Sequence, residues 1–259
     1  MKNGRPGRDI APWIKMFESS ALYRHDYGRL FDDWLTILVC MFANGKMEED
    51  YLKVIGRYNR KEVDVIVAMT GTFMDLMCTN VPEAGHWYDA LGEIYMYLNS
   101  RSKSSALGQF FTPPELCDMI AGMMKQEHKP GQVILEPACG SGRMVLAAHA
   151  LNPCRDLRIA IDLDPMCAKM TAVNFLLHGV KSEVACANTL WPDKWYFAYQ
   201  THPYLWNPFI VPVPREKSLT APRMELIRDQ SVAAVVAKAN DASVPKKDPP
   251  LLVQGSLFE

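Results

Sequence analysis

The chain has 259 residues, of which 49% are hydrophobic and 22% charged, and this composition excludes a disordered chain, a collagen and a coiled coil. Its 28 Lys and Arg residues against 29 Asp and Glu residues give a net charge of -1, which provides no general attraction to nucleic acid or to an acidic membrane. If nucleic acid is the partner, the basic groups must be clustered locally or come from another subunit.

The seven Cys residues form no Cys-x-x-Cys motif, and the chain has no leader-like start, so we expect reduced thiols and a cytoplasmic location. The longest apolar run, residues 34–43, is shorter than the roughly 20 residues that span a bilayer, so no membrane partner is expected. The six His residues are scattered without the spacing of metal ligands, so we predict no metal site.

Residues 11–100 show the helical spacing of apolar side chains. One stripe contains Trp34, Leu35, Leu38, Val39 and Phe42, and another contains Val63, Ile66, Val67, Thr70, Phe73, Met74 and Met77. We predict a helical bundle of about four or five helices as an N-terminal domain over residues 1–105, which ends in a polar stretch.

The pattern then changes to strands that alternate with helices. In chain order we predict a helix over residues 115–126, a strand over 133–135, a helix over 143–151, a strand over 157–161, a helix from Pro165 that ends before Gly179, and a strand over 184–186. This order predicts an α/β domain over residues 106–222, with a doubly wound, Rossmann-like parallel sheet. Residues 223–240 predict a C-terminal helix, and residues 241–259 a flexible tail.

The carboxyl ends of the three predicted strands carry polar groups and a glycine turn. Gly140 and Gly142 allow the backbone to approach a ligand closely, and Asp162 can accept hydrogen bonds from both hydroxyls of a ribose. Val145 stands where a dinucleotide-binding motif has its third Gly, so the turn favours S-adenosylmethionine over a dinucleotide.

Four segments of the chain carry a resemblance to a known family. In chain order they are Gly108-Gln109-Phe110-Phe111-Thr112-Pro113, Glu136-Pro137-Ala138-Cys139-Gly140-Ser141-Gly142, Asp162-Leu163-Asp164-Pro165 and Asn188-Thr189-Leu190. They resemble the ordered cofactor motifs of N6-adenine DNA methyltransferases, and above all those of the modification subunits of type I restriction systems, which also begin with a helical domain.

The resemblance implies S-adenosylmethionine as the cofactor and assigns roles to individual positions. It implies cofactor contacts from Phe110, Thr112 and Pro113 at the methionine end, from Glu136, Ala138, Gly140 and Gly142 at the glycine turn, from Asp162 to the ribose and from Asn188 to the adenine. The alternatives are core packing for Phe110 and Phe111 and a solvated strand end for Glu136. Cys139 is interpreted as a small packing residue.

The family activates the adenine amino group with Asp or Asn, Pro, Pro, and Tyr or Phe, and this tetrapeptide is missing from the sequence. The nearest match assigns Asn207, Pro208 and Phe209 as catalytic candidates but lacks one Pro. A competing half-match, Thr201-His202-Pro203-Tyr204, lacks the amide. The alternative is that both segments are Pro-rich turns that expose aromatic residues.

The segment after Phe209 has 50 residues, too few for the remaining strands of a complete family sheet plus a target-recognition domain. We therefore expect a truncated sheet. Its open edge would need cover from the helix over residues 223–240, from the N-terminal bundle or from another subunit.

The resemblance implies an N6-adenine DNA methyltransferase-like protein of a restriction-modification system or a mobile element, with DNA and a specificity or other subunit as partners. One alternative is a cofactor-binding module of the same descent that has lost catalysis and acts through DNA or protein contacts. A weaker alternative is a methyltransferase for a protein or a small molecule.

The last residues of the chain resemble the peptide by which bacterial replication and repair proteins dock on the sliding clamp. Leu257 and Phe258 would fill an apolar pocket of the clamp, while Gln254 makes a directional hydrogen bond. The alternative is that Leu251, Leu252, Leu257 and Phe258 fold back over the open edge of the sheet.

Overall fold

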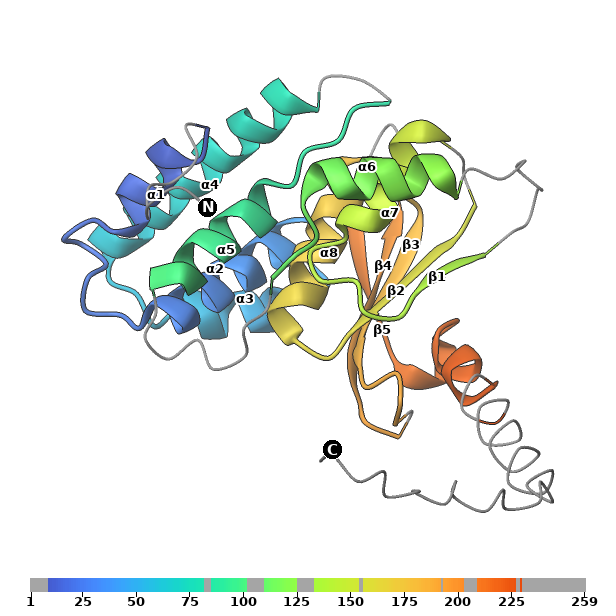
Figure 1. Ribbon diagram of the computed structural model, residues 1–259. Helices are drawn as coiled ribbons and strands as arrows, with labels where there is room; N and C mark the ends of the chain where they lie inside the picture. The colour runs from blue at the N-terminus through green and yellow to red at the C-terminus, as the bar shows by residue number, and fades with distance from the viewer. Residues whose placement is uncertain are drawn as a thin grey trace, which may run out of the picture.

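The computed structural model describes residues 9–81, 85–101, 110–124, 133–153, 156–191, 193–202, 209–226 and 229. The helical part consists of α1 (Ala11–Phe17), α2 (Tyr27–Met41), α3 (Glu48–Ile55), α4 (Arg60–Asn80) and α5 (Ala90–Arg101). The second part consists of α6 (Pro114–Met123), β1 (Ile134–Glu136), α7 (Arg143–Leu151), β2 (Arg158–Asp162), α8 (Pro165–Leu177), β3 (Ser182–Ala187), β4 (Trp195–His202), β5 (Phe209–Val213) and the short 3-10 helix η1 (Arg215–Lys217). The predicted helical bundle followed by an α/β sheet is confirmed (Figure 1).

Local side chains satisfy the first backbone N–H groups of α2 and α4. The Asp26 carboxylate accepts a hydrogen bond from the N–H of Arg29 at the start of α2. At the start of α4, Asn59 and Glu62 form a reciprocal capping box. No helix among the described residues is long and apolar enough to cross a membrane.

Aromatic side chains fill the core of the helical part. The rings of Trp13 and Trp34 lie 4.7 Å apart, and Phe73 meets Trp34 edge-on at 5.4 Å. The Trp34 indole also donates to Thr70, which joins α2 to α4. The predicted stripe of α4 is wrong at one position, because Val67 is 64% exposed and lies one residue beyond the row that contains Ile66 and Phe73.

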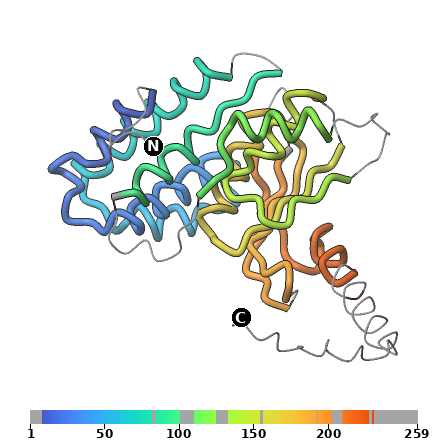
Figure 2. Tube along the Cα trace, in the orientation of Figure 1, coloured from blue at the N-terminus to red at the C-terminus, as the bar shows by residue number. Residues whose placement is uncertain are grey.

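The five strands lie in the order β1-β2-β3-β4-β5. β1, β2 and β3 are parallel and are connected by α7 and α8, whereas β4 runs antiparallel to β3, and β5 antiparallel to β4. The helical part packs on the same face of the sheet as α8 (Figures 1 and 2). Lys169 of α8 donates a hydrogen bond to Asp32 of α2 at 2.6 Å. The antiparallel β4–β5 pair was not predicted from the sequence, so the sheet is mixed rather than parallel throughout.

The other face of the sheet is covered by the chain that follows β5. Ile159, Ile161 and Ala185 form a small apolar cluster there with Met224, which lies in helical residues 221–226.

The buried carboxylate of Glu183 anchors the segment that follows β5. It accepts hydrogen bonds from the Ser218 hydroxyl, from the backbone N–H groups of Leu219 and Thr220, and from the Gln200 amide. Burial would raise the pKa of Glu183, but these hydrogen bonds outweigh burial and lower it.

A buried carboxylate joins the two parts of the chain. Asp89, directly before α5, is 3% exposed. Its Oδ1 accepts from the N–H of Gly92 and from the Asn174 amide, and its Oδ2 accepts from the Ser141 hydroxyl and from Nε of Arg143. A Cβ on Gly92 would lie 2.0 Å from Asp89 Oδ2 and 2.6 Å from the Ser141 Oγ, so this contact requires glycine in α5.

We predict opposite effects for two Gly→Ala substitutions in helices. Gly92→Ala should lower the free energy of unfolding by about 2–3 kcal/mol, because the new methyl group displaces buried hydrogen-bonding groups. Gly71→Ala in α4, where an added Cβ meets nothing within 4 Å, should raise it by about 0.5–1 kcal/mol. Urea unfolding measures both values, and equal effects would contradict the close contact at Gly92.

Candidate functional site

A hollow of about 150 Å³ lies where β1 ends and α7 begins. Its lining brings together Phe110, Phe111, Thr112, Glu136, Ala138, Cys139, Gly140, Ser141, Arg143 and Met144. Five of the residues predicted from sequence therefore share one cavity, although Phe110 and Glu136 are 26 positions apart. Pro113, Gly142, Asp162 and Asn188 are not part of this lining.

The glycine turn has the backbone conformation that glycine permits. Gly140 has φ 56° and Gly142 has φ 90°. A Cβ on Gly140 would lie 2.9 Å from the Phe111 ring, and a Cβ on Gly142 would lie 2.7 Å from the Phe175 ring. The turn thus needs glycine at both positions for its conformation and for its contacts.

Asp162 lies at the end of β2 and holds the turn in place. Its Oδ2 accepts the N–H of Gly140 at 2.8 Å, and its Oδ1 accepts the N–H of Asp164 at 2.9 Å. Burial raises the pKa of Asp162, although these backbone hydrogen bonds oppose the rise. Each carboxylate oxygen has a second lone pair, so Asp162 can still accept hydrogen bonds from a ligand.

Glu136 is half-buried at the end of β1, and this differs from the solvated strand end that was the alternative. Burial raises the pKa of Glu136, while a hydrogen bond from the N–H of Ala138, at 3.4 Å, opposes the rise. Cys139 is buried against Thr171, as expected of a small packing residue, and burial raises the pKa of its thiol.

The two adjacent Phe residues have different environments. Phe111 stacks on Tyr95 with ring centroids 5.2 Å apart, and the Arg143 guanidinium carbon lies 5.6 Å from the Phe111 ring centroid. Phe110 is 77% exposed at the hollow. Core packing therefore describes Phe111 and not Phe110. Pro113 is exposed and is the N-cap residue of α6.

Asn188, at the end of β3, uses its side-chain oxygen locally. It accepts the backbone N–H groups of Leu190 and Trp191 at 3.0 and 3.1 Å and so forms a turn. The same edge of the sheet exposes Leu163 (54%) and Leu190 (78%), which follow β2 and β3. No role was predicted for these two side chains, although a large apolar residue within three positions of each strand end was an available signal.

The structure does not bring Phe209 to this edge. Phe209 pairs with His202, and Thr201 pairs with Ser182 at the amino end of β3, so β5 begins at the edge opposite Asp162. The length of β3 separates the two edges by about 15–20 Å. Asn207 and Pro208 lie outside the described residues. In the competing half-match, Thr201 is buried, and its hydroxyl donates to the Val180 carbonyl.

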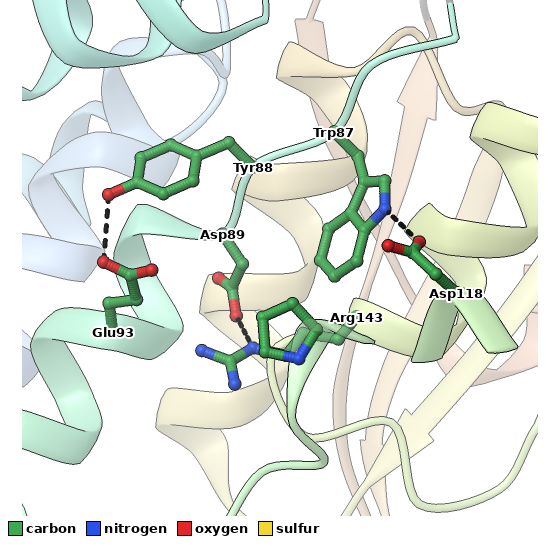
Figure 3. A pocket seen from close by; sticks show the side chains of 7 residues that line it. Trp87, Tyr88, Asp89, Glu93, Asp118 and Arg143 are labelled. Carbon is green, nitrogen blue, oxygen red and sulfur yellow. Dashed lines mark hydrogen bonds and ion pairs between the residues drawn. The ribbon is translucent and has the colours of Figure 1, made fainter. Parts of the chain in front are cut away.

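A second, smaller hollow of about 110 Å³ adjoins the first at Arg143 (Figure 3). Its lining consists of Trp87, Tyr88, Asp89, Glu93, Pro114, Asp118 and Arg143. The Trp87 indole donates to Asp118, and the Tyr88 hydroxyl donates to Glu93. Burial raises the pKa of Glu93 above its usual range.

Comparisons with known proteins give one family and several relatives. Residues 86–210 match the N-6 DNA Methylase family. The chain is 35% identical over 98 residues to the Type I restriction enzyme MjaVIII methylase subunit of Methanocaldococcus jannaschii, a match that covers 36% of this chain and 16% of that protein. It is 26% identical over 115 residues to the MjaIX methylase subunit of the same organism, with coverage of 41% and 20%. These matches span no more than about a fifth of either relative.

Among solved structures, the chain is similar to the type I restriction-modification system methyltransferase subunit from Streptococcus thermophilus. The sequence identity is 22%, the TM-score is 0.32, and the match covers 68% of this chain and 38% of the other.

Substitutions at two glycines with positive φ distinguish the cost of backbone strain from the cost of a packing clash. Gly142→Ala should lower the free energy of unfolding by about 2–4 kcal/mol, because strain adds to the clash with Phe175. Gly179→Ala should lower it by about 1 kcal/mol, since Gly179 has φ 69° but an added Cβ meets nothing within 4 Å. Chemical denaturation compares the two, and a larger loss at Gly179 would contradict the packing described for the turn.

Proposed function

We propose that this chain, whose residues 86–210 match the N-6 DNA Methylase family, binds S-adenosylmethionine at the carboxyl ends of β1, β2 and β3 as an N6-adenine DNA methyltransferase-like protein. The hydrogen bond from the Gly140 N–H to the Asp162 carboxylate supports the proposal best, because it joins the glycine turn to a carboxylate suited to accept ribose hydroxyls at one edge of the sheet. When bound, S-adenosylmethionine supplies a methyl group on a sulfonium.

The residues at this edge suit the parts of that cofactor. Asp162 offers acceptors for the ribose hydroxyls, and the exposed Leu163 and Leu190 offer apolar contacts to a purine. Phe110 and the Thr112 backbone border the hollow beside the glycine turn, where we place the methionine portion. Asn188 remains a proposed contact to the adenine.

The position of Phe209 favours the second candidate, a cofactor-binding module with impaired catalysis. Two acceptors beside a flipped adenine are needed to free its amino lone pair, and Phe209 begins β5 at the edge opposite the proposed cofactor. We propose that efficient methyl transfer by Asn207, Pro208 and Phe209 does not occur in the isolated chain. A methyltransferase for a protein or a small molecule remains the weaker alternative.

We also propose a restriction-modification system or mobile element as the setting, DNA as the partner and a specificity or other subunit as the companion, in the cytoplasm. The net charge of -1 supports a companion, because the chain supplies no overall positive field for DNA. Docking on the sliding clamp through Gln254, Leu257 and Phe258 remains a separate proposal, and these residues lie outside the described part of the chain. A pull-down that retains the full chain but not one ending at Pro250 would support it.

Replacing Asp162 by Ala should weaken the binding of S-adenosylhomocysteine, the demethylated product, by about 1–3 kcal/mol, because ligand hydroxyls lose their acceptor. Isothermal titration calorimetry measures this change, with Asp64→Ala on the exposed face of α4 as the control. Absence of binding by the wild type, or unchanged affinity of Asp162→Ala, would overturn the assignment.

The same titration has an expected pH dependence. Ligand hydroxyls need the ionised carboxylate, and burial raises the pKa of Asp162, so affinity should fall on acidification, beginning at a higher pH than for an ordinary Asp. Asp162→Ala should lack this component of the pH dependence.

The isolated chain should transfer labelled methyl groups to unmethylated bacterial DNA at least about a hundredfold more slowly than when neighbouring gene products are added, because loose placement of the acceptors is costly. Robust adenine methylation by the chain alone, abolished by Asn207→Ala and preserved in Tyr204→Ala, would contradict this expectation and favour an active enzyme.

A further inference from the structure

We propose that Asp89 is a positioning residue that sets the methionine side of the cofactor pocket from the helical part of the chain. The proposal rests on the cofactor site proposed above and adds a dependence of that site on the helical part. Asp89 does not line the hollow between Phe110 and Glu136, so it would act through the groups that it binds.

Asp89 has its full hydrogen-bonding capacity occupied. Gly92 and Asn174 donate to Oδ1 at 2.7 and 2.8 Å, while Ser141 and Arg143 donate to Oδ2, each at 2.5 Å. These four donors come from α5, α8, the glycine turn and α7, so one carboxylate fixes four segments relative to one another. An amide at this position could accept through one atom only and would direct two N–H groups at two of the donors.

Arg143 transmits this constraint to the segment that borders the pocket. Its side chain is 6% exposed and pairs with Asp89 through Nε. Its Nη1 donates to the Thr112 carbonyl at 3.2 Å, and its guanidinium lies over the Phe111 ring. The arrangement of Asp89 and Arg143 beside the adjoining hollow is visible in Figure 3.

The two halves of the pocket depend on Asp89 to different extents. Asp162 is the last residue of β2, and Asn188 directly follows β3; the strand pairing of the sheet holds both strands. Phe111 and Thr112 precede α6, and their described polar contact to α7 runs through Arg143. Loss of the Asp89 charge leaves a buried guanidinium without its counter-ion, so this segment should shift first.

The test uses the full chain and two ligands, S-adenosylhomocysteine and 5′-methylthioadenosine, which lacks the amino-acid portion. Asp89→Asn should weaken the binding of S-adenosylhomocysteine about tenfold or more, which is the effect of one lost charged hydrogen bond. It should leave the affinity for 5′-methylthioadenosine unchanged. Asp118→Asn, an exposed carboxylate in the same hollow as Asp89, is the matched control and should change neither affinity. Calorimetry serves for the first ligand and an NMR titration for the second.

Hydrogen exchange of the free protein gives a readout that needs no ligand. The backbone N–H groups of Phe110, Phe111 and Thr112 should exchange faster in Asp89→Asn, while those of β2 and β3 should not change. If Asp89→Asn does not fold, the test uses Ser141→Ala, which removes one donor to Asp89 and keeps the charge pair with Arg143. Ser141→Ala should weaken the binding of S-adenosylhomocysteine about threefold or more and leave the binding of 5′-methylthioadenosine unchanged.

An equal loss of affinity for both ligands in Asp89→Asn would overturn the proposal, since it would indicate a general loss of structure. Unchanged binding of S-adenosylhomocysteine in both Asp89→Asn and Ser141→Ala would also overturn it. A wild type that binds neither ligand would instead overturn the proposed cofactor site, and the positioning role with it.

Discussion

The buried charge pair between Asp89 and Arg143 is the interaction on which the arrangement of the two parts depends. A carboxylate 3% exposed is tolerated inside a protein only when it is paired and fully hydrogen-bonded. Here the counter-ion comes from α7 and the remaining donors from α5, α8 and the glycine turn. Separation of the helical part from the sheet would therefore uncover an unpaired charge, so the two parts are coupled energetically.

The same carboxylate is one of several groups that contact the glycine turn. The turn is held from the sheet by Asp162, from α8 by Phe175 and Thr171, and from the helical part by Asp89. A ligand that binds at the turn would meet donors already in place, which reduces the entropic cost of binding. With the positioning role proposed for Asp89, the helical part would contribute to the proposed site as well as to the fold.

The direction of β4 is the second constraint with functional consequences. A parallel fourth strand would end at the same edge as β1, β2 and β3, but the antiparallel β4 ends at their amino edge and leads from there to β5. The far face of the sheet is covered by the segment after β5, which Glu183 anchors through several hydrogen bonds. These features leave the proposed cofactor edge intact while they separate it from Phe209.

The sequence by itself determined the features that have local causes. The helical spacing of apolar residues predicted the helical part, and the alternation of strands and helices predicted the first three strands. The glycines with Asp162 predicted a ligand edge. Turn chemistry and residue spacing act over a few positions, so these features can be read from the sequence. The tertiary structure decided the direction of β4, the partial burial of Phe111 beside an exposed Phe110, and the ion pair between Asp89 and Arg143. Asp89 and Arg143 are 54 positions apart, and no local pattern encodes their ion pair, since it exists only when packing removes both groups from water.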